Sequence, residues 1–284
     1  MTTEVAVRAE GLSKSYRGWR RRENWALRDC TFELPRGQVT ALVGANGAGK
    51  STLLGMLAGL LDPAGGTVDV AGRTAFVAQD KPVYKQLTAP DMLRLAARLN
   101  ETWDQRRATR WLDRFEVPAD RRCARLSGGQ RAQVAFAVAL GARPDVLLLD
   151  EPLSNLDPLA RREVMTELLA ETADAGMAVV LSTHVVAELG GVADRLLLLA
   201  RGRLVADGEV DRLLGEHLHY VGPRADEPPG PGEVIEARHE ERQSTFLVRL
   251  AGGTPVVAEP WITRPVTLED LVLARLAASR KEAA

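Results

Sequence analysis

Apolar runs and amphipathic segments alternate along most of this chain. The runs at 38–44 (QVTALVG), 145–150 (DVLLLD) and 177–182 (MAVVLS) are mainly apolar, which is typical of parallel strands buried on both faces. Elsewhere apolar residues recur at steps of three and four, which predicts helices. These helical segments are KSTLLGMLAGL (50–60), PDMLRLAARLN (90–100) and QRRATRWLDRFEV (105–117). Strands that alternate with helices predict an α/β domain with a mostly parallel central sheet.

Shorter β-rich segments flank this pattern. VAV (5–7) and TFEL (31–34) precede the first buried strand, and RLLLLARGRLVADG (195–208) predicts a hairpin that turns at residues 201–203. The composition then changes near residue 215. GPRADEPPGPGE (222–233) is rich in proline, glycine and charge, which is typical of a linker or mobile loop.

Strand-like EVIEARH and STFLVRL follow that stretch, and TLEDLVLARLAASRKE (267–282) predicts a final helix. We therefore expect a main domain over residues 4–215 and a C-terminal accessory region over residues 216–284. Residues after about 222 contain none of the motifs described below, so we expect their removal to leave ligand binding in the main domain intact.

Composition narrows the class of protein. The 284 residues are 45% hydrophobic and 26% charged, with a formal net charge of -1, so nothing indicates a nucleic acid or an anionic membrane surface as partner. Cys30 and Cys123 form neither a metal-binding spacing nor a disulfide framework, which favours a reduced, cytosolic protein. MTTEVAVRAE does not have the pattern of a signal peptide, and no apolar run approaches the ~20 residues that span a bilayer. We expect any attachment to a membrane to depend on a partner.

A glycine-rich loop lies between the first buried strand and the first helix. Its sequence, GANGAGKS (44–51), fits G-x-x-x-x-G-K-[ST], in which backbone N–H groups surround phosphates, the lysine reaches the β- and γ-phosphates, and the final hydroxyl binds Mg²⁺. The candidate nucleotide-binding residues here are Gly44, Asn46, Gly47, Ala48, Gly49, Lys50, Ser51 and Thr52.

Two carboxylates end the buried strand of VLLLDEP (146–152). Asp150 lies at the carboxyl end of this strand, where ligands bind in open α/β sheets, and there it can hold Mg²⁺. Glu151 comes next and can orient or deprotonate an attacking water.

A second candidate anion site lies far along the chain, in RLSGGQRAQ (125–133). Ser127, Gly128, Gly129 and Gln130 open a helical stretch, and the free N–H groups at a helix start attract anions. The chain therefore has two candidate phosphate-binding sites, separated by about 80 residues.

Motifs in a fixed order identify a family resemblance. GANGAGKST, Gln79, LSGGQ, VLLLDEP, SNLD and His184 occur in the order and spacing of the ATP-binding subunits of ABC transporters, which residues 4–215 resemble. The resemblance implies a P-loop NTPase fold of the ABC ATPase type, with a small antiparallel β subdomain, a helical subdomain over about residues 80–142 that carries LSGGQ, and a small α+β C-terminal extension. It also implies ATP and Mg²⁺ as cofactors.

In this family two chains pair head to tail, as a homodimer or with a related ATPase subunit. The phosphate loop of one chain and the LSGGQ of the other then close on the same ATP. Ser127, Gly128, Gly129 and Gln130 would thus complete the neighbouring chain's site, and Asp157 of SNLD would meet the neighbour's phosphate loop.

The resemblance assigns further roles. Glu151 and His184 are the candidate catalytic residues, with His184 contacting the γ-phosphate and the attacking water. Gln79 would bind Mg²⁺ beside Ser51 and Asp150, and would sense the membrane partner. Tyr16 resembles the aromatic residue that stacks on adenine, and Trp25 remains an alternative because RGWRRRENW is longer than the usual spacing.

Two features set this chain apart from the family pattern. The segment 59–79 is short and lacks a charged stretch, so we expect a reduced antiparallel subdomain. VTLEDLVLARLA resembles the C-terminal helix of bacterial exporter subunits that pair with a separate ABC-2 type permease.

The expected function is that of an ATPase on the cytoplasmic face of the membrane that drives such a permease, with KPVYKQLTAPDML (81–93) as the docking surface. An importer subunit, and an ABC ATPase of DNA repair or translation, remain alternatives, although no nucleic acid partner is expected.

Overall fold

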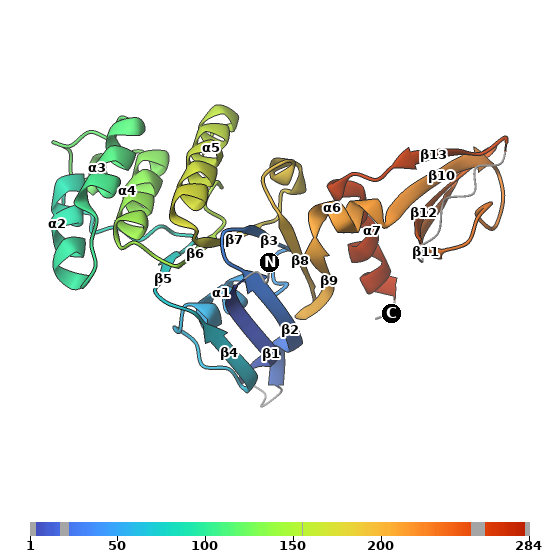
Figure 1. The fold of residues 1–284 in the computed structure, drawn as a ribbon, viewed down its shortest axis with the longest axis horizontal. Coiled ribbons are helices and arrows are strands. Elements are labelled where there is room, and N and C mark those ends of the chain that lie inside the picture. Colours follow the sequence, from blue (N-terminus) through green and yellow to red (C-terminus); the bar gives the residue numbers. More distant parts are fainter. Residues whose placement is uncertain (1–3, 18–22, 155, 251–258, 282–284) are drawn as a thin grey trace.

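A six-stranded sheet lies at the centre of the protein (Figure 1). The computed structural model describes residues 4–17, 23–154, 156–250 and 259–281. Five neighbouring strands are parallel, and the sixth pairs antiparallel at one edge, as the alternation of strands and helices predicts. In spatial order the strands are β5 (Thr74–Val77), β6 (Val146–Asp150), β7 (Ala178–Thr183), β3 (Val39–Val43), β8 (Arg195–Ala200) and β9 (Arg203–Glu209).

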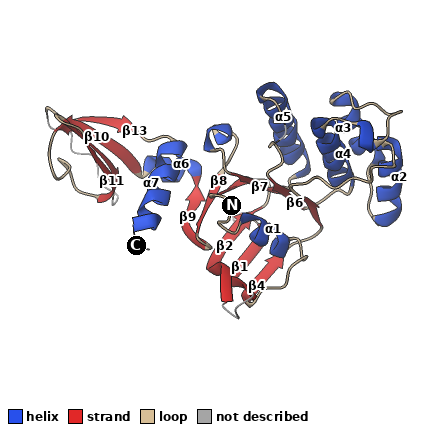
Figure 2. Ribbon diagram, turned by 180° about the vertical axis from the view of Figure 1, so that it is seen from behind, coloured by secondary structure: helices blue, strands red, loops and turns tan. Residues whose placement is uncertain are grey.

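Both faces of this sheet are covered, which explains why its central strands are mainly apolar on both faces. Along β6, Leu147 and Leu149 contribute to one hydrophobic core, and Val146 and Leu148 contribute to the other. Figure 2 shows a group of helices on one side of the sheet, and α1 with an antiparallel sheet on the other. The helices are α1 (Lys50–Leu57), α2 (Ala89–Leu99), α3 (Gln105–Arg114), α4 (Gly128–Gly141) and α5 (Pro158–Ala175), with 3₁₀ turns η1 (Cys123–Arg125) and η2 (Val186–Leu189).

The predicted hairpin at residues 195–208 is confirmed by β8 and β9. Arg201 and Gly202 form its turn with φ angles of 50° and 77°, the positive values that match the twist of the two strands.

Three helices form a subdomain between residues 89 and 141. Thr88, Asp104 and Ser127 cap the starts of α2, α3 and α4 through side-chain oxygens that accept backbone N–H groups. Inside the subdomain, Trp111 is 2% exposed and donates its indole N–H to Gln133 at 2.9 Å. LSGGQ therefore lies at the start of a helix, α4, that packs tightly against the rest of the subdomain.

The expected small antiparallel sheet has three strands, in the order β2–β1–β4. They are β1 (Val5–Arg17), β2 (Glu23–Pro35) and β4 (Gly65–Val70). Sequence reasoning did not identify β4, because its half-exposed GGTVDV lacks a strong apolar pattern. Residues 18–22, which carry the unusual spacing after Tyr16, lie outside the described residues.

The proline-rich stretch 222–233 is not a linker between domains. It joins β10 (His217–Pro223) to β11 (Glu233–His239) within a second antiparallel sheet, whose order is β11–β12–β10–β13. The remaining elements of the accessory region are α6 (Val210–Gly215), β12 (Gln243–Arg249), β13 (Ile262–Pro265) and α7 (Leu268–Lys281). The structure describes the predicted final helix up to Lys281, and Glu282 lies outside the described residues.

Helix α7 returns to the six-stranded sheet and packs near η2, β8 and β9. Leu271 and Val272 are each 1% exposed and belong to the same hydrophobic core as α2–α5. The proposed boundary at residue 215 therefore separates two sheets but cuts through a shared core. In the part of the chain that the structure describes, no helix is both long and apolar enough to cross a membrane.

Candidate active site

The glycine-rich loop 44–49 connects β3 to α1, and two of its glycines lie against the backbone of other strands. A Cβ on Gly44 would lie 2.5 Å from the carbonyl oxygen of Leu199, and one on Gly49 would lie 2.5 Å from that of Ala26. Gly49 also has a φ of 110°, in the region that side chains disfavour. The loop is therefore held between β8 and β2 with no space for side chains at these two positions.

Lys50 folds back over this loop from the first turn of α1. Its ammonium donates to the carbonyl oxygens of Gly44 at 2.8 Å and Ala45 at 3.4 Å, and its side chain is 6% exposed. Burial lowers the pKa of Lys50, while the carboxylates of Glu151 and Asp150 act in the opposite direction. The loop thus encloses a positive charge beside two carboxylates.

A cavity of about 370 Å³ opens beside the loop. Its described wall comprises Ala26, Asn46, Gly47, Gly49, Lys50, Ser51, Thr52, Gln79 and Glu151. This volume is typical of small-molecule sites. Most of the sequence-predicted residues of the glycine-rich loop therefore meet Gln79 and Glu151 at one cavity, although residues up to 125 positions apart contribute to it.

Asp150 is fixed at the end of β6 by a serine on the neighbouring strand β7. The Ser182 hydroxyl donates to the Asp150 carboxylate at 2.6 Å and accepts the backbone N–H of Glu151 at 2.9 Å. Sequence reasoning did not single out Ser182; the available signal was a polar residue at the end of the buried run MAVVLS. The serine orients the first carboxylate and fixes the backbone of the second.

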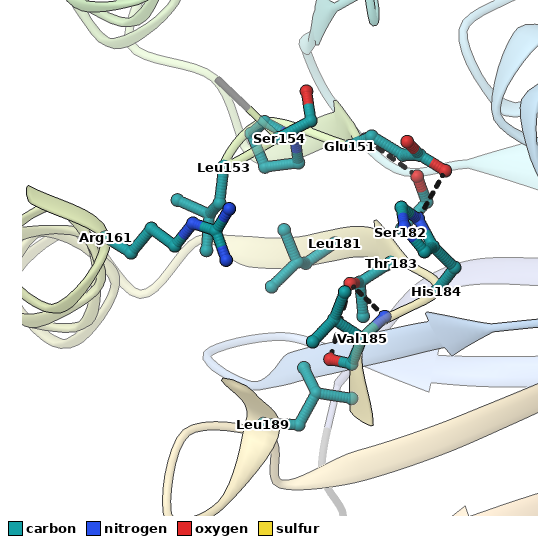
Figure 3. Close-up of a pocket in the computed structure, with 11 residues that line it drawn as sticks. Glu151, Leu153, Ser154, Arg161, Leu181, Ser182, Thr183, His184, Val185 and Leu189 are labelled. Carbon is teal, nitrogen blue, oxygen red and sulfur yellow. Dashed lines mark hydrogen bonds and ion pairs between the residues drawn. The ribbon is translucent and has the colours of Figure 1, made fainter. Parts of the chain in front are cut away.

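Glu151 lies where three predicted side chains converge, and Figure 3 shows one of them, His184, beside its carboxylate. Its carboxylate accepts the Gln79 amide at 3.2 Å, lies 3.1 Å from Nδ1 of His184, and is 3.8 Å from the Lys50 ammonium. Its backbone has a φ of 43°, which is uncommon for a residue with a side chain. Strain of this kind concentrates at functional sites.

The LSGGQ segment forms the start of α4. Ser127 and Gln130 cap it reciprocally: the Ser127 hydroxyl accepts the Gln130 N–H at 3.1 Å, and the Gln130 side chain accepts the Ser127 N–H at 3.0 Å. Ser127, Gly128, Gly129, Gln130 and Asp157 line a separate cavity of about 550 Å³. The described walls of this cavity and of the loop cavity share no residue.

Asp157 caps α5, because its carboxylate accepts the N–H groups of Leu159 and Ala160 at 3.0 Å. Asn155, the second residue of the SNLD motif, lies outside the described residues.

Tyr16 and Trp25 lie near the ends of the paired strands β1 and β2 of the small sheet. The Lys14 ammonium lies 5.8 Å from the Tyr16 ring, and the Arg28 guanidinium lies 5.8 Å from the Trp25 ring. The described wall of the loop cavity contains neither ring, but it contains Ala26, which follows Trp25. Both aromatic residues therefore remain candidates for the adenine contact.

The donor atoms near the loop suit a hard cation. Ser51, Gln79 and Asp150 offer a hydroxyl, an amide carbonyl and a carboxylate, the oxygen ligands that Mg²⁺ prefers. The described residues contain no cluster of three or more histidine, cysteine, aspartate or glutamate side chains that could hold a metal. This donor set fits an Mg²⁺ ion that takes its remaining ligands from phosphates and water.

Comparison with known proteins agrees with this geometry. The model of the ABC transporter family matches residues 27–154. The chain is 38% identical over 198 residues to the aliphatic sulfonates import ATP-binding protein SsuB of Escherichia coli O1:K1 / APEC, covering 66% of this chain and 77% of that protein. This chain belongs to the ATP-binding proteins of ABC transporters.

Two further similarities support the assignment. The daunorubicin/doxorubicin resistance ATP-binding protein DrrA of Streptomyces peucetius is 34% identical over 225 residues, covering 73% of this chain and 66% of that protein. A solved ATP-binding subunit of an ABC transporter is 30% identical with a TM-score of 0.65, covering 73% of this chain and 91% of that one. The chain is thus an ABC-type ATPase, and the predicted fold class is confirmed.

Proposed function

We propose that this chain hydrolyses ATP at two composite sites of a head-to-tail dimer and thereby drives a separately encoded membrane permease. The convergence of Gln79, His184 and Lys50 on the Glu151 carboxylate carries the proposal, because it brings two polar partners and a cation to a base that lines the loop cavity. When bound, ATP with Mg²⁺ supplies the phosphoryl group that water attacks.

The chain's own residues then have separate tasks. The N–H groups of the loop and the Lys50 ammonium hold the phosphates, and Ser51, Gln79 and Asp150 hold Mg²⁺. Glu151 orients the water and accepts its proton, and His184 stabilises the water and the γ-phosphate. In the dimer, Ser127 and its glycines bind the phosphates of the partner chain's ATP through the start of α4.

Replacing Glu151 with glutamine tests the catalytic assignment. Glu151→Gln keeps the shape and removes the basic charge, so we expect kcat to fall by about 100-fold or more while the affinity for ATP changes less than about threefold. Turnover and binding of a fluorescent ATP analogue measure the two effects. Glu240→Gln, at an exposed position in the turn between β11 and β12, is the matched control and should keep full turnover. Near-normal turnover of Glu151→Gln would reject the role.

A mixing experiment tests the dimer. Lys50→Ala damages a chain's own site, whereas Ser127→Arg damages the site that it shares with its neighbour. We expect each variant alone to be nearly inactive and an equimolar mixture to regain part of the turnover, because a mixed dimer has one site with both defects and one with neither. Since strong coupling between sites can mask this gain, cysteines at positions 51 and 127 provide a second readout. An ATP-dependent disulfide between chains supports the arrangement, and one confined to a single chain contradicts it.

We propose export through an ABC-2 type permease, at the cytoplasmic face of the membrane. The C-terminal helix α7 and the similarity to a drug-resistance ATP-binding protein support this direction. Import is the second candidate, because another relative is an import ATP-binding protein. Co-purification of the chain with the product of a neighbouring six-helix permease gene tests the partner. A substrate-binding protein encoded beside it would indicate import instead.

A further inference from the structure

Lys81 is a buried lysine that has no role in the proposed function. It follows Gln79 by two residues, its φ is 47°, and the residue is 4% exposed. The chain uses lysine sparingly, since five of its 37 basic residues are lysines. Lys50 and Lys81 are the lysines that the described structure buries.

Burial of this ammonium costs free energy that an apolar side chain of similar length avoids. Burial lowers the pKa of Lys81, and the carboxylates of Glu151, Asp150 and Asp80 oppose that shift. Since a hydrophobic residue at such a position is often neutral or stabilising, stability alone does not account for the charge.

The contacts of the ammonium suggest what it does. Nζ lies 3.3 Å from the Ser154 hydroxyl, 3.4 Å from the Glu151 carbonyl oxygen and 3.5 Å from the Gln79 carbonyl oxygen. An ammonium has three donors, and here three oxygens surround it, a geometry that the planar fork of arginine does not match.

Glu151 needs such support because its backbone is left-handed, a conformation that costs about 1–2 kcal/mol for a residue with a side chain. Its carbonyl oxygen also accepts the Ser154 N–H at 3.3 Å, which closes the turn after β6. Lys81 thus contacts two backbone segments, 79–81 and 151–154. The Gln79 side chain of the first segment donates a hydrogen bond to the Glu151 carboxylate of the second.

We propose that Lys81 is a positioning residue for ATP hydrolysis. Its ammonium connects the backbones of Gln79 and Glu151 by contacting both carbonyl oxygens. In this way it keeps the Glu151 carboxylate between the Gln79 amide and the His184 ring. The inference rests on the proposed role of Glu151. Lys81 is also the first residue of the segment 81–93, where a permease would dock. Through Lys81, a movement of this segment would be transmitted to the Glu151 backbone.

The test compares Lys81→Met with wild type in the full-length chain. We expect kcat to fall by about 10- to 100-fold, because small displacements of a catalytic group have effects of this size, while KM for ATP stays within about threefold. The melting temperature should stay equal or rise, since the substitution removes a buried charge. Arg98→Met, which removes an exposed positive charge from α2, is the control and should leave kcat unchanged.

Ser154→Ala provides a second test that keeps the lysine. It removes one of the three acceptors, so we expect a loss of kcat of about twofold to fivefold, and the double variant should lose less than the product of the single losses. Normal kcat in a folded Lys81→Met chain, or a raised KM with unchanged kcat, overturns the inference. If Lys81→Met does not fold, normal kcat in Ser154→Ala overturns it.

Glu151→Gln in the same assay separates this inference from the proposed function. An inactive Glu151→Gln with a fully active Lys81→Met rejects the inference alone. An active Glu151→Gln rejects the proposed role of the carboxylate.

Discussion

Two glycines of the phosphate loop differ in what surrounds them, although both have positive φ. A Cβ at Gly49 would meet the Ala26 carbonyl oxygen at 2.5 Å, whereas a Cβ at Gly47 has nothing within 4 Å. The φ angles are 110° and 80°. The pair therefore separates the effect of a steric clash from that of backbone strain.

We expect Gly49→Ala to lower the free energy of unfolding by about 3 kcal/mol and to abolish ATP binding, because the loop must move away from β2. Gly47→Ala should cost about 1 kcal/mol of stability from backbone strain. Urea denaturation and nucleotide titration measure both effects. Equal losses of stability in the two variants would show that the contact with Ala26 is unimportant.

At the scale of elements, an ion-pair cluster joins α3 of the helical subdomain to α5 of the core. Glu171 on α5 is 7% exposed at its side chain and binds Arg107, whose side chain is 10% exposed. It also binds Arg110 at 2.8 Å. A second pair, Arg114 with Glu167 at 3.6 Å, lies on the same interface but is more exposed.

We expect Glu171→Gln to lower the free energy of unfolding by about 2 kcal/mol, because it leaves the Arg107 guanidinium buried without a countercharge. Glu167→Gln, on the exposed pair, should cost less than about 0.5 kcal/mol. Thermal unfolding monitored by circular dichroism compares them. A larger loss from the exposed pair would contradict the assignment of the buried pair as the principal contact.

At the scale of the whole molecule, α7 changes the expectation for the C-terminal region. The sequence suggested that removal of the residues after about 222 would leave ATP binding intact while weakening dimer contacts, permease assembly or regulation. The structure places Leu271 in the hydrophobic core that α7 shares with α2–α5. Leu271 is 1% exposed, while Leu273 on the same helix is 50% exposed.

Leu271→Ala should therefore lower the free energy of unfolding of the full-length chain by about 3 kcal/mol, because it leaves a cavity beneath η2, β8 and β9. Leu273→Ala should change it by less than about 0.5 kcal/mol. Both variants are compared by denaturant unfolding. If Leu271→Ala is as stable as wild type, the packing of α7 does not contribute to the stability of the core.

The sequence by itself determined the local features of this protein. The buried strands and the glycine-rich loop were predicted because apolar runs and glycine spacing act within a few residues. The family motifs identified Asp150, Glu151 and the capping pair Ser127 and Gln130. The reciprocal hydrogen bonds of Ser127 and Gln130 join residues only three positions apart.

The tertiary structure decided which of these elements meet. The order β5–β6–β7 brings Gln79 and His184 to Glu151, across 72 and 33 residues. Lys81 is separated from Ser154 by 73 residues. Helix α7 packs into a hydrophobic core that also contains strands distant from it in the sequence. No local periodicity encodes such pairings, because they depend on how whole faces of helices and sheets fill space against one another.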